Sequence, residues 1–113
     1  MYKRQVHAKE AGDLVFLSGV GPRHPDTDAI PEGIEAQTHA VFSNVIAILE
    51  AAGLTMSNVV DIMVFLTDMK NDFQKFNAIY AEYLDGYEAT RTSVEVGSLP
   101  TPISVEFKVV AKK

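Results

Sequence analysis

The chain of 113 residues contains no cysteine and no tryptophan. Without cysteine there is no disulfide framework, no thiolate zinc site and no cysteine nucleophile, which is compatible with a cytoplasmic location. Positive charge is also scarce, with 10 Lys and Arg against 15 Asp and Glu and a net charge of -5. A nucleic-acid partner is therefore not expected, because neutralising phosphates needs clustered basic residues. His7, His24 and His39 lack the spacing of metal ligands, so no metal site is expected.

Long apolar runs are absent as well. None approaches the ~20 residues that span a bilayer, and the segment "MYKRQVHAKEAGD" lacks the apolar centre of a signal peptide. We therefore expect no membrane partner. A length of 113 residues normally makes one domain, and no repeat or linker divides it. We predict a single domain over residues 1–113.

Two amphipathic segments predict helices. In residues 34–53 apolar side chains recur at steps of three, four and seven, and Gly53 suits the position after a helix end. Residues 71–86 form the second predicted helix, which Gly86 ends. The stripe of the first helix is Ile34, Val41, Val45, Ile48 and Ala52, widened by Phe42 and Leu49. The stripe of the second is Phe73, Phe76, Tyr80 and Leu84.

Apolar and β-branched runs predict the strands. They cover residues 14–19, 58–68, 90–96 and 103–110, with an extra strand near 5–8. The order strand, helix, strand, helix, strand, strand predicts an α/β two-layer sandwich, in which two helices cover one face of a mixed sheet.

Several of these strands are apolar on both sides, above all "LVFL" and "IMVFL". An uncovered sheet face of this kind would be an apolar patch that monomers rarely expose. We therefore predict that an oligomer with closed cyclic symmetry buries it. The alternative is a longer, curved sheet that buries its own face.

The last two predicted strands carry charge away from their apolar stripes. With a period of two, polar side chains gather on one side of each strand. They are Arg91, Ser93 and Glu95 on one strand and Ser104, Glu106 and Lys108 on the other. If the strands pair, these side chains share a face. An Arg fork binds a carboxylate and a Glu can hold a water molecule, which suits hydration of a small carboxylic acid. The alternative is a solvated face with weak surface ion pairs.

Weaker candidates lie elsewhere. The turn at Ser18 and Gly19 could offer backbone N–H groups to a ligand, although the proline-rich loop behind it excludes a dinucleotide-binding fingerprint. Asn77 lies near the apolar stripe of the second helix. A half-buried amide needs a partner, which is either backbone or a ligand.

The segment "TRTSVEVGSLPTPISVEFKVVA" closely resembles the C-terminal signature of the RidA family, also called YjgF. The segments "FLSGVGP", "AQTHAVFSNVIAILEAAGLTMSNVV" and "VFLTDMKNDFQKFNAIYAEYL" resemble its other segments in order, so the resemblance covers nearly the whole chain. It implies a fold similar to chorismate mutase and a homotrimer with clefts between subunits.

The resemblance also implies an activity. Enzymes of this family hydrolyse reactive enamines and imines of amino acids, such as 2-aminoacrylate and 2-iminobutanoate, to a 2-keto acid and ammonia without a cofactor. Arg91 matches the arginine that binds the substrate carboxylate, and Glu106 matches the glutamate that places the attacking water. Gly19 matches a glycine lining the site, Ser18 precedes it, and Asn77 matches an asparagine of the second helix.

The chain departs from the family pattern in places. Gln5 stands where the family carries a tyrosine, and Ser93 where many members have cysteine. The segment "HAKEAGDLVFLSGVGPRHPDTD" looks more like the 2-aminomuconate deaminase branch, whose substrate is an enamine dicarboxylate. Arg23 and His24 would then meet the second carboxylate; alternatively they belong to a solvated loop.

Two rival functions stay open. One is a non-catalytic module that binds small carboxylic acids on the same scaffold, since a fold alone does not give function. The other is a ribonuclease or translation inhibitor, as attached to some relatives. The acidic charge and the lack of a catalytic histidine pair argue against the second.

Overall fold

The computed structural model describes residues 7–113. The elements are β1 (Ala8–Ala11), β2 (Leu14–Leu17), α1 (Ile34–Ala51), the 3-10 helix η2 (Met56–Asn58), β3 (Val59–Leu66), α2 (Met69–Leu84), β4 (Thr90–Glu95) and β5 (Val105–Lys112). A tight turn at Gly12, with φ +62°, joins the first two strands. Ala8 aligns with Leu17 and Ala11 with Leu14 in this hairpin.

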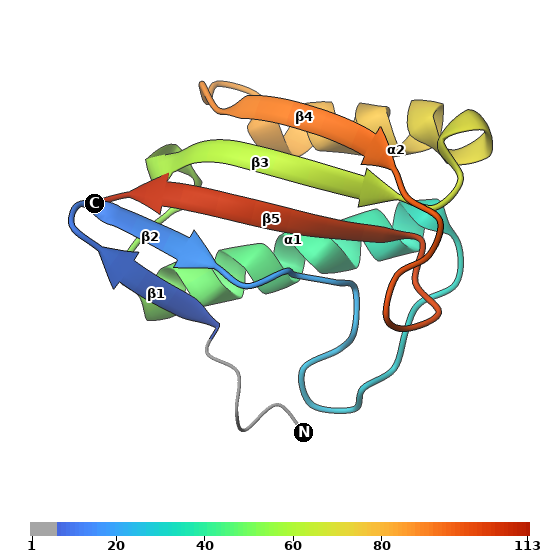
Figure 1. Ribbon diagram of the computed structural model, residues 1–113, viewed down its shortest axis with the longest axis horizontal. Helices are drawn as coiled ribbons and strands as arrows, with labels where there is room; N and C mark the ends of the chain where they lie inside the picture. Colours follow the sequence, from blue (N-terminus) through green and yellow to red (C-terminus); the bar gives the residue numbers. More distant parts are fainter. Residues whose placement is uncertain (1–6) are drawn as a thin grey trace.

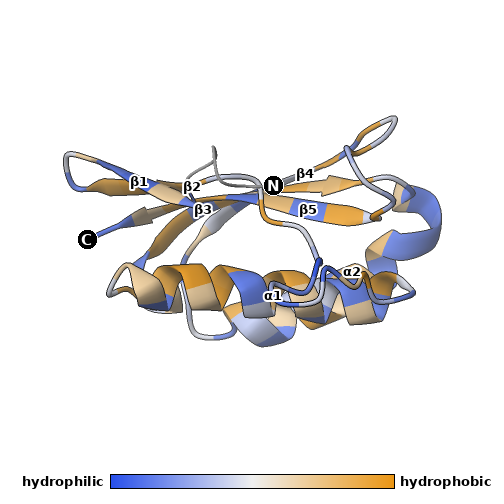
Figure 2. Cartoon of the chain, turned by 90° about the horizontal axis from the view of Figure 1, so that it is seen from below, coloured by the Kyte–Doolittle hydropathy of each residue, from blue (hydrophilic) through white to orange (hydrophobic). Residues whose placement is uncertain are grey.

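The five strands form one sheet in the order β1-β2-β5-β3-β4 (Figure 1). β3 and β4 are parallel, and the other pairs are antiparallel. Both helices lie under the same face of the sheet (Figure 2). The predicted two-layer sandwich with a mixed sheet is therefore confirmed, whereas its likeness to chorismate mutase stays a prediction. Within residues 7–113 no helix is long and apolar enough to cross a membrane.

The core lies between the helices and the sheet. Along β5 every second residue is buried against the helices, namely Val105, Phe107, Val109 and Ala111. α1 ends at Ala51, and Gly53, whose φ is +79°, occupies the predicted position after the helix end. There Gly53 N–H donates to the Glu50 carbonyl and Leu54 N–H to the Leu49 carbonyl, a Schellman motif.

The predicted boundaries need small corrections. α2 begins at Met69 rather than residue 71, because Asp68 caps it and accepts a hydrogen bond from Asn71 N–H at 3.3 Å. β5 is shifted two residues along the chain from its predicted range. The extra strand predicted near 5–8 falls partly on residues 1–6, which lie outside the described residues. The first described strand is β1, at Ala8–Ala11.

The last two strands do not pair, so the condition for one shared polar face is not met. β3 lies between β4 and β5. Arg91 aligns with Ile62 of β3, whereas Glu106 aligns with Phe65. Because successive strand residues point to opposite faces, Arg91 lies on the helix side of the sheet and Glu106 on the open side. The cause is the crossover through α2, which sets β4 parallel beside β3 and leaves β5 to pair on the other edge of β3.

The open side of the sheet is not covered by any described element (Figure 2). It carries apolar side chains that are only partly buried: Phe16, Met63, Phe65, Val94 and Val110. Phe16 and Val94 are each 37% exposed. The expectation that the helices cover one face is confirmed, while burial of the other face in an oligomer stays a prediction.

Candidate functional site

Arg91 projects from the edge strand β4 toward α2. Its Nη1 donates a hydrogen bond to Asn77 Oδ1 at 2.7 Å. Its Cζ atom lies 4.6 Å from the centre of the Tyr80 ring and 5.8 Å from that of Phe73. Among residues 7–113 no carboxylate lies within ion-pair distance of Arg91. The guanidinium is therefore held by neutral groups and keeps donors for an anion.

Gly19 and Glu106 meet on the open side of the sheet. Phe16 aligns with Val110, and Val20 forms a bridge with Phe107, so β2 carries one extra residue at this point. This β-bulge brings the Gly19 backbone against Glu106. A Cβ atom on Gly19 would lie 3.1 Å from Glu106 Cδ, closer than side chains normally pack. The glycine thus makes room for the carboxylate.

Burial raises the pKa of Glu106 above its usual value of 4.5. The cause is desolvation, which disfavours the charged form. A carboxylate with a raised pKa is a stronger base than an exposed one, which suits holding and deprotonating a water molecule. Such perturbed groups gather at functional sites.

Lys108 shares the open side of β5 with Glu106. Its Nζ donates a hydrogen bond to the carbonyl oxygen of Leu17, which directly precedes the bulge. The lysine is half-buried. A bulge disrupts the ladder of hydrogen bonds between two strands locally. Lys108 adds a side-chain bond there and ties the end of β2 to β5.

Two hydroxyl groups near Arg91 are buried without a hydrogen-bond partner in the described residues. They are Tyr80 Oη and Ser93 Oγ. Ser93 lies on the same side of β4 as Arg91, opposite Val64. Burial also raises the pKa of Tyr80, an effect that the nearby Arg91 charge opposes. Unpaired buried hydroxyls are unfavourable, and in native proteins they call for an explanation.

Arg23 and His24 lie in the loop between β2 and α1, away from Arg91 on the far edge strand (Figure 1). Arg23 Nη1 donates to the Asp28 carbonyl at 3.0 Å. His24 Nδ1 accepts hydrogen bonds from the backbone N–H groups of Asp26 and Thr27, at 3.1 and 3.3 Å. Both side chains thus order their own loop.

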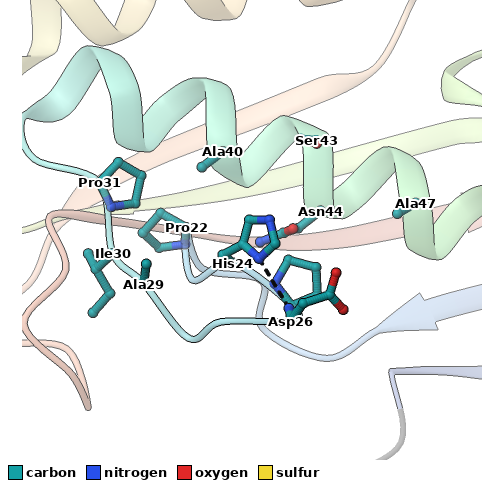
Figure 3. Close-up of a pocket in the computed structure, with 11 residues that line it drawn as sticks. Pro22, His24, Asp26, Ala29, Ile30, Pro31, Ala40, Ser43, Asn44 and Ala47 are labelled. Atoms are coloured by element: carbon teal, nitrogen blue, oxygen red, sulfur yellow. Dashed lines mark hydrogen bonds between the residues drawn. The ribbon is translucent and has the colours of Figure 1, made fainter.

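The same loop and α1 border a pocket of about 360 Å³. Its walls are mostly proline, alanine and isoleucine, with His24, Asp26, Ser43 and Asn44 as polar members (Figure 3). Asn44 Nδ2 donates to the Gly21 and Arg23 carbonyls, each at 2.9 Å, which fixes the loop on the helix. None of the family-matched residues Arg91, Glu106 and Asn77 lines this pocket.

One chain therefore holds the candidate residues in separate groups. Arg91, Asn77 and Ser93 lie at the β4 edge beside α2, whereas Ser18, Gly19 and Glu106 lie at the bulge on the open side. Tyr80, expected only as part of an apolar stripe, contacts the first group. The sequence signal was its place three residues after Asn77, which puts both on one face of α2. Lys108 belongs to the second group and was predicted only as a member of a polar strand face.

The amino-acid sequence is similar to that of several known proteins. The family model described as Endoribonuclease L-PSP matches residues 2–113. A RutC family protein of Pyrococcus horikoshii is 42% identical over 107 residues, covering 94% of this chain and 84% of that protein. The protein TdcF of Escherichia coli, provisionally named a reactive intermediate deaminase, is 36% identical over 109 residues, covering 94% and 84%.

Solved structures agree with these sequence matches. The structure of E. coli TdcF with bound serine has a TM-score of 0.89 and 34% identity, covering 96% of this chain and 87% of that one. The E. coli YjgF structure has a TM-score of 0.92 and 32% identity, covering 100% and 91%. The resemblance to the family is thereby confirmed, while the 2-aminomuconate branch is not. The chain belongs to the Endoribonuclease L-PSP family, which includes the YjgF, RidA and RutC proteins.

Proposed function

We propose that this protein hydrolyses reactive enamine or imine intermediates of amino acids to a 2-keto acid and ammonia, without a cofactor. The relative TdcF carries the name of such a deaminase, and its structure holds serine, a small amino acid. In this chain, the observation that carries the proposal is that two ionisable side chains, Arg91 and Glu106, lack a partner of opposite charge within residues 7–113. Arg91 has no carboxylate partner among the described residues, and Glu106 is desolvated beside Gly19.

The chemistry follows from these two groups. The Arg91 fork binds the substrate carboxylate through two parallel hydrogen bonds. An enamine first tautomerises to the imine, whose carbon is electrophilic. Water held by Glu106 adds to that carbon, giving a carbinolamine, which expels ammonia and leaves the ketone. Because the imine is already reactive, positioning supplies much of the rate.

The site requires a second copy of the chain. Arg91 and Glu106 point to opposite sides of one sheet, so a single chain cannot present both to one small substrate. We propose a cyclic homotrimer whose clefts combine Arg91, Asn77 and Ser93 of one subunit with Ser18, Gly19 and Glu106 of the next. The partly exposed apolar side chains of the open face favour such burial.

The substrate is best sought among monocarboxylates such as 2-aminoacrylate and 2-iminobutanoate. A dicarboxylate such as 2-aminomuconate would need a second cation, for which Arg23 is the candidate. Arg23 already donates to the Asp28 carbonyl of its own loop. That bond uses one of its five N–H donors and holds the guanidinium against its own loop.

The test is ammonia release from freshly generated 2-iminobutanoate and, in parallel, from 2-aminomuconate. Wild type should release ammonia from the first, and Arg91→Ala should abolish this without unfolding the protein. Arg23→Ala is the matched control, since it removes an arginine outside the proposed monocarboxylate site. Binding of 2-oxobutanoate without any turnover would instead support the non-catalytic acid-binding module.

A further inference from the structure

Within residues 7–113, the hydrogen bond and the ring contacts of the Arg91 guanidinium come from one face of α2. Phe73, Asn77 and Tyr80 follow each other at steps of four and three, which places them in line on the helix surface. Asn77 Oδ1 accepts a hydrogen bond from one N–H of the guanidinium, and the Cζ atom lies over the rings of Phe73 and Tyr80. A cation within about 6 Å of an aromatic ring centre is attracted by the ring. The nearer ring, that of Tyr80, makes the stronger contact.

Tyr80 is itself fixed in the core. The residue is 7% exposed. Its ring packs against Phe42, Phe76 and Phe107, with centre-to-centre distances of 5.7, 5.6 and 6.3 Å. A ring confined in this way cannot swing with an arginine side chain. Its contact with Arg91 therefore connects a side chain of the exposed edge strand to the rigid interior.

We propose that Tyr80 is a positioning residue for Arg91, whose aromatic face fixes the direction of the free guanidinium N–H groups. Bidentate recognition of a carboxylate depends on the orientation of the planar fork. Arg91 is exposed and sits on an edge strand, so β4 alone does not restrict its long side chain. Asn77 fixes one point of the guanidinium, and the Tyr80 ring fixes its plane.

The hydroxyl group of Tyr80 takes no part in this contact. It is buried without a partner in the described residues, so removing it should not weaken the fold. The ring and the hydroxyl can therefore be separated by substitution. Tyr80→Phe keeps the ring, and Tyr80→Leu removes it while leaving an apolar side chain in the core.

The matched control is Tyr83→Leu. Tyr83 lies on the same helix, stacks on Phe42 at 4.1 Å, and belongs to the same aromatic group. Within residues 7–113 the guanidinium of Arg91 contacts the rings of Phe73 and Tyr80, not that of Tyr83. The two leucine variants thus share a loss of aromatic packing, and Tyr80→Leu alone removes a ring contact with Arg91. Tyr83→Leu also removes the 2.9 Å hydrogen bond between Tyr83 Oη and His39 Nδ1, so it is the more disruptive of the two at the helix surface.

The experiment is ¹⁵N relaxation of the Arg91 Nε–H group in the full-length protein, assigned with Arg91→Lys. The order parameter should fall below about 0.6, the flexible range, in Tyr80→Leu only. Tyr80→Phe should restore the wild-type value, and Tyr83→Leu should leave it unchanged. An Arg91 side chain that stays rigid in Tyr80→Leu, or becomes equally mobile in Tyr83→Leu, would overturn the proposal.

A second readout is calorimetric binding of 2-oxobutanoate, a stable 2-keto acid. Tyr80→Leu should weaken binding about two- to fivefold, as expected for a lost cation–π contact at an exposed site. The inference rests on the proposed function only in taking Arg91 as the carboxylate-binding group. If the wild-type protein shows no turnover but the order parameters change as described, the deaminase proposal is refuted and the positioning role of Tyr80 is still supported.

Discussion

A single methyl group at Gly19 tests how closely the bulge and the carboxylate depend on each other. In Gly19→Ala the added Cβ would lie 3.1 Å from Glu106 Cδ and nearer still to Oε2. The backbone of Gly19 does not have the positive φ that favours glycine, so the backbone itself tolerates alanine. The strain falls on the end of the Glu106 side chain, which must move away.

The expected magnitudes separate activity from stability. The Glu106 carboxylate must shift by roughly 1 Å, and a displacement of that size can lower the rate about 100-fold. An off-rotamer glutamate costs about 0.5–1.5 kcal/mol. Replacing glycine by alanine at a permitted φ stabilises the fold by about 0.4–1 kcal/mol, because alanine lowers the conformational entropy of the unfolded chain. The free energy of unfolding should therefore change by less than about 1 kcal/mol, and Tm by only about 5 °C.

The assay is kcat/KM for 2-iminobutanoate, together with thermal unfolding. Gly21→Ala is the control, because its Cβ would lie 3.2 Å from Cδ1 of Ile103, a tight but milder contact away from Glu106. We expect activity to fall in Gly19→Ala and to stay near wild type in Gly21→Ala. Equal activity in both variants, with both folded, would refute the claim that Gly19 makes room for the Glu106 carboxylate.

Three further predictions concern neighbouring groups. Burial raises the pKa of Glu106 above 4.5, so its ionisation disfavours the fold: its contribution to stability is greatest below pH 4.5 and is lost as pH rises through the raised value. Glu106→Gln should therefore raise Tm at pH 7 while abolishing turnover, and the Tm gain should vanish in scans below pH 4.5; a gain independent of pH would contradict this. Lys108→Met removes the charge-assisted hydrogen bond to the Leu17 carbonyl and should lower the free energy of unfolding in urea titrations by about 1–3 kcal/mol; unchanged stability would show that the lysine does not hold the bulge. Asn77→Leu removes the 2.7 Å hydrogen bond to Arg91 and should raise KM roughly tenfold with the fold intact; an unchanged KM in steady-state kinetics would exclude that role.

Much of the fold could be predicted from the sequence, because local periodicity records which side chains face the core. Both helices and four of the five strands were expected near their observed positions, and Gly53 marks the end of α1 as predicted. Ile48 and Ala52, expected in the buried stripe of α1, are half-buried and exposed, because they line an open groove beside His7 and Ala8. Which edge of an apolar stripe is buried depends on the element packed against it, and the local pattern does not give that.

The arrangement of the site was harder to predict. The alternation of side chains along a strand correctly places Arg91 and Ser93 on the opposite face of β4 from Thr92. It does not indicate which strands are neighbours in the sheet. The insertion of β5 between β2 and β3 is a property of the whole sheet, and it put Arg91 and Glu106 on opposite sides. The contact between Tyr80 and Arg91 likewise depends on the packing of α2 against the edge strand.

The bulge could not be predicted from residue types alone. "SG" after an apolar run indicates only a turn, whereas the structure shows Gly19 packed against Glu106 and the Leu17 carbonyl bound by Lys108. Each of these contacts joins residues far apart in sequence. The resemblance to the family named the residues, and the structure shows which of them one chain brings together.

The most direct test of the account mixes two inactive variants. Arg91→Ala and Glu106→Gln are unfolded together, refolded as a mixture, and assayed for ammonia release from 2-iminobutanoate. If each cleft takes Arg91 from one subunit and Glu106 from the next, about a quarter of the clefts in random cyclic assemblies carry both wild-type groups. Recovery of about a quarter of wild-type activity is the predicted result. A mixture as inactive as its two components would contradict a site shared between copies of the chain.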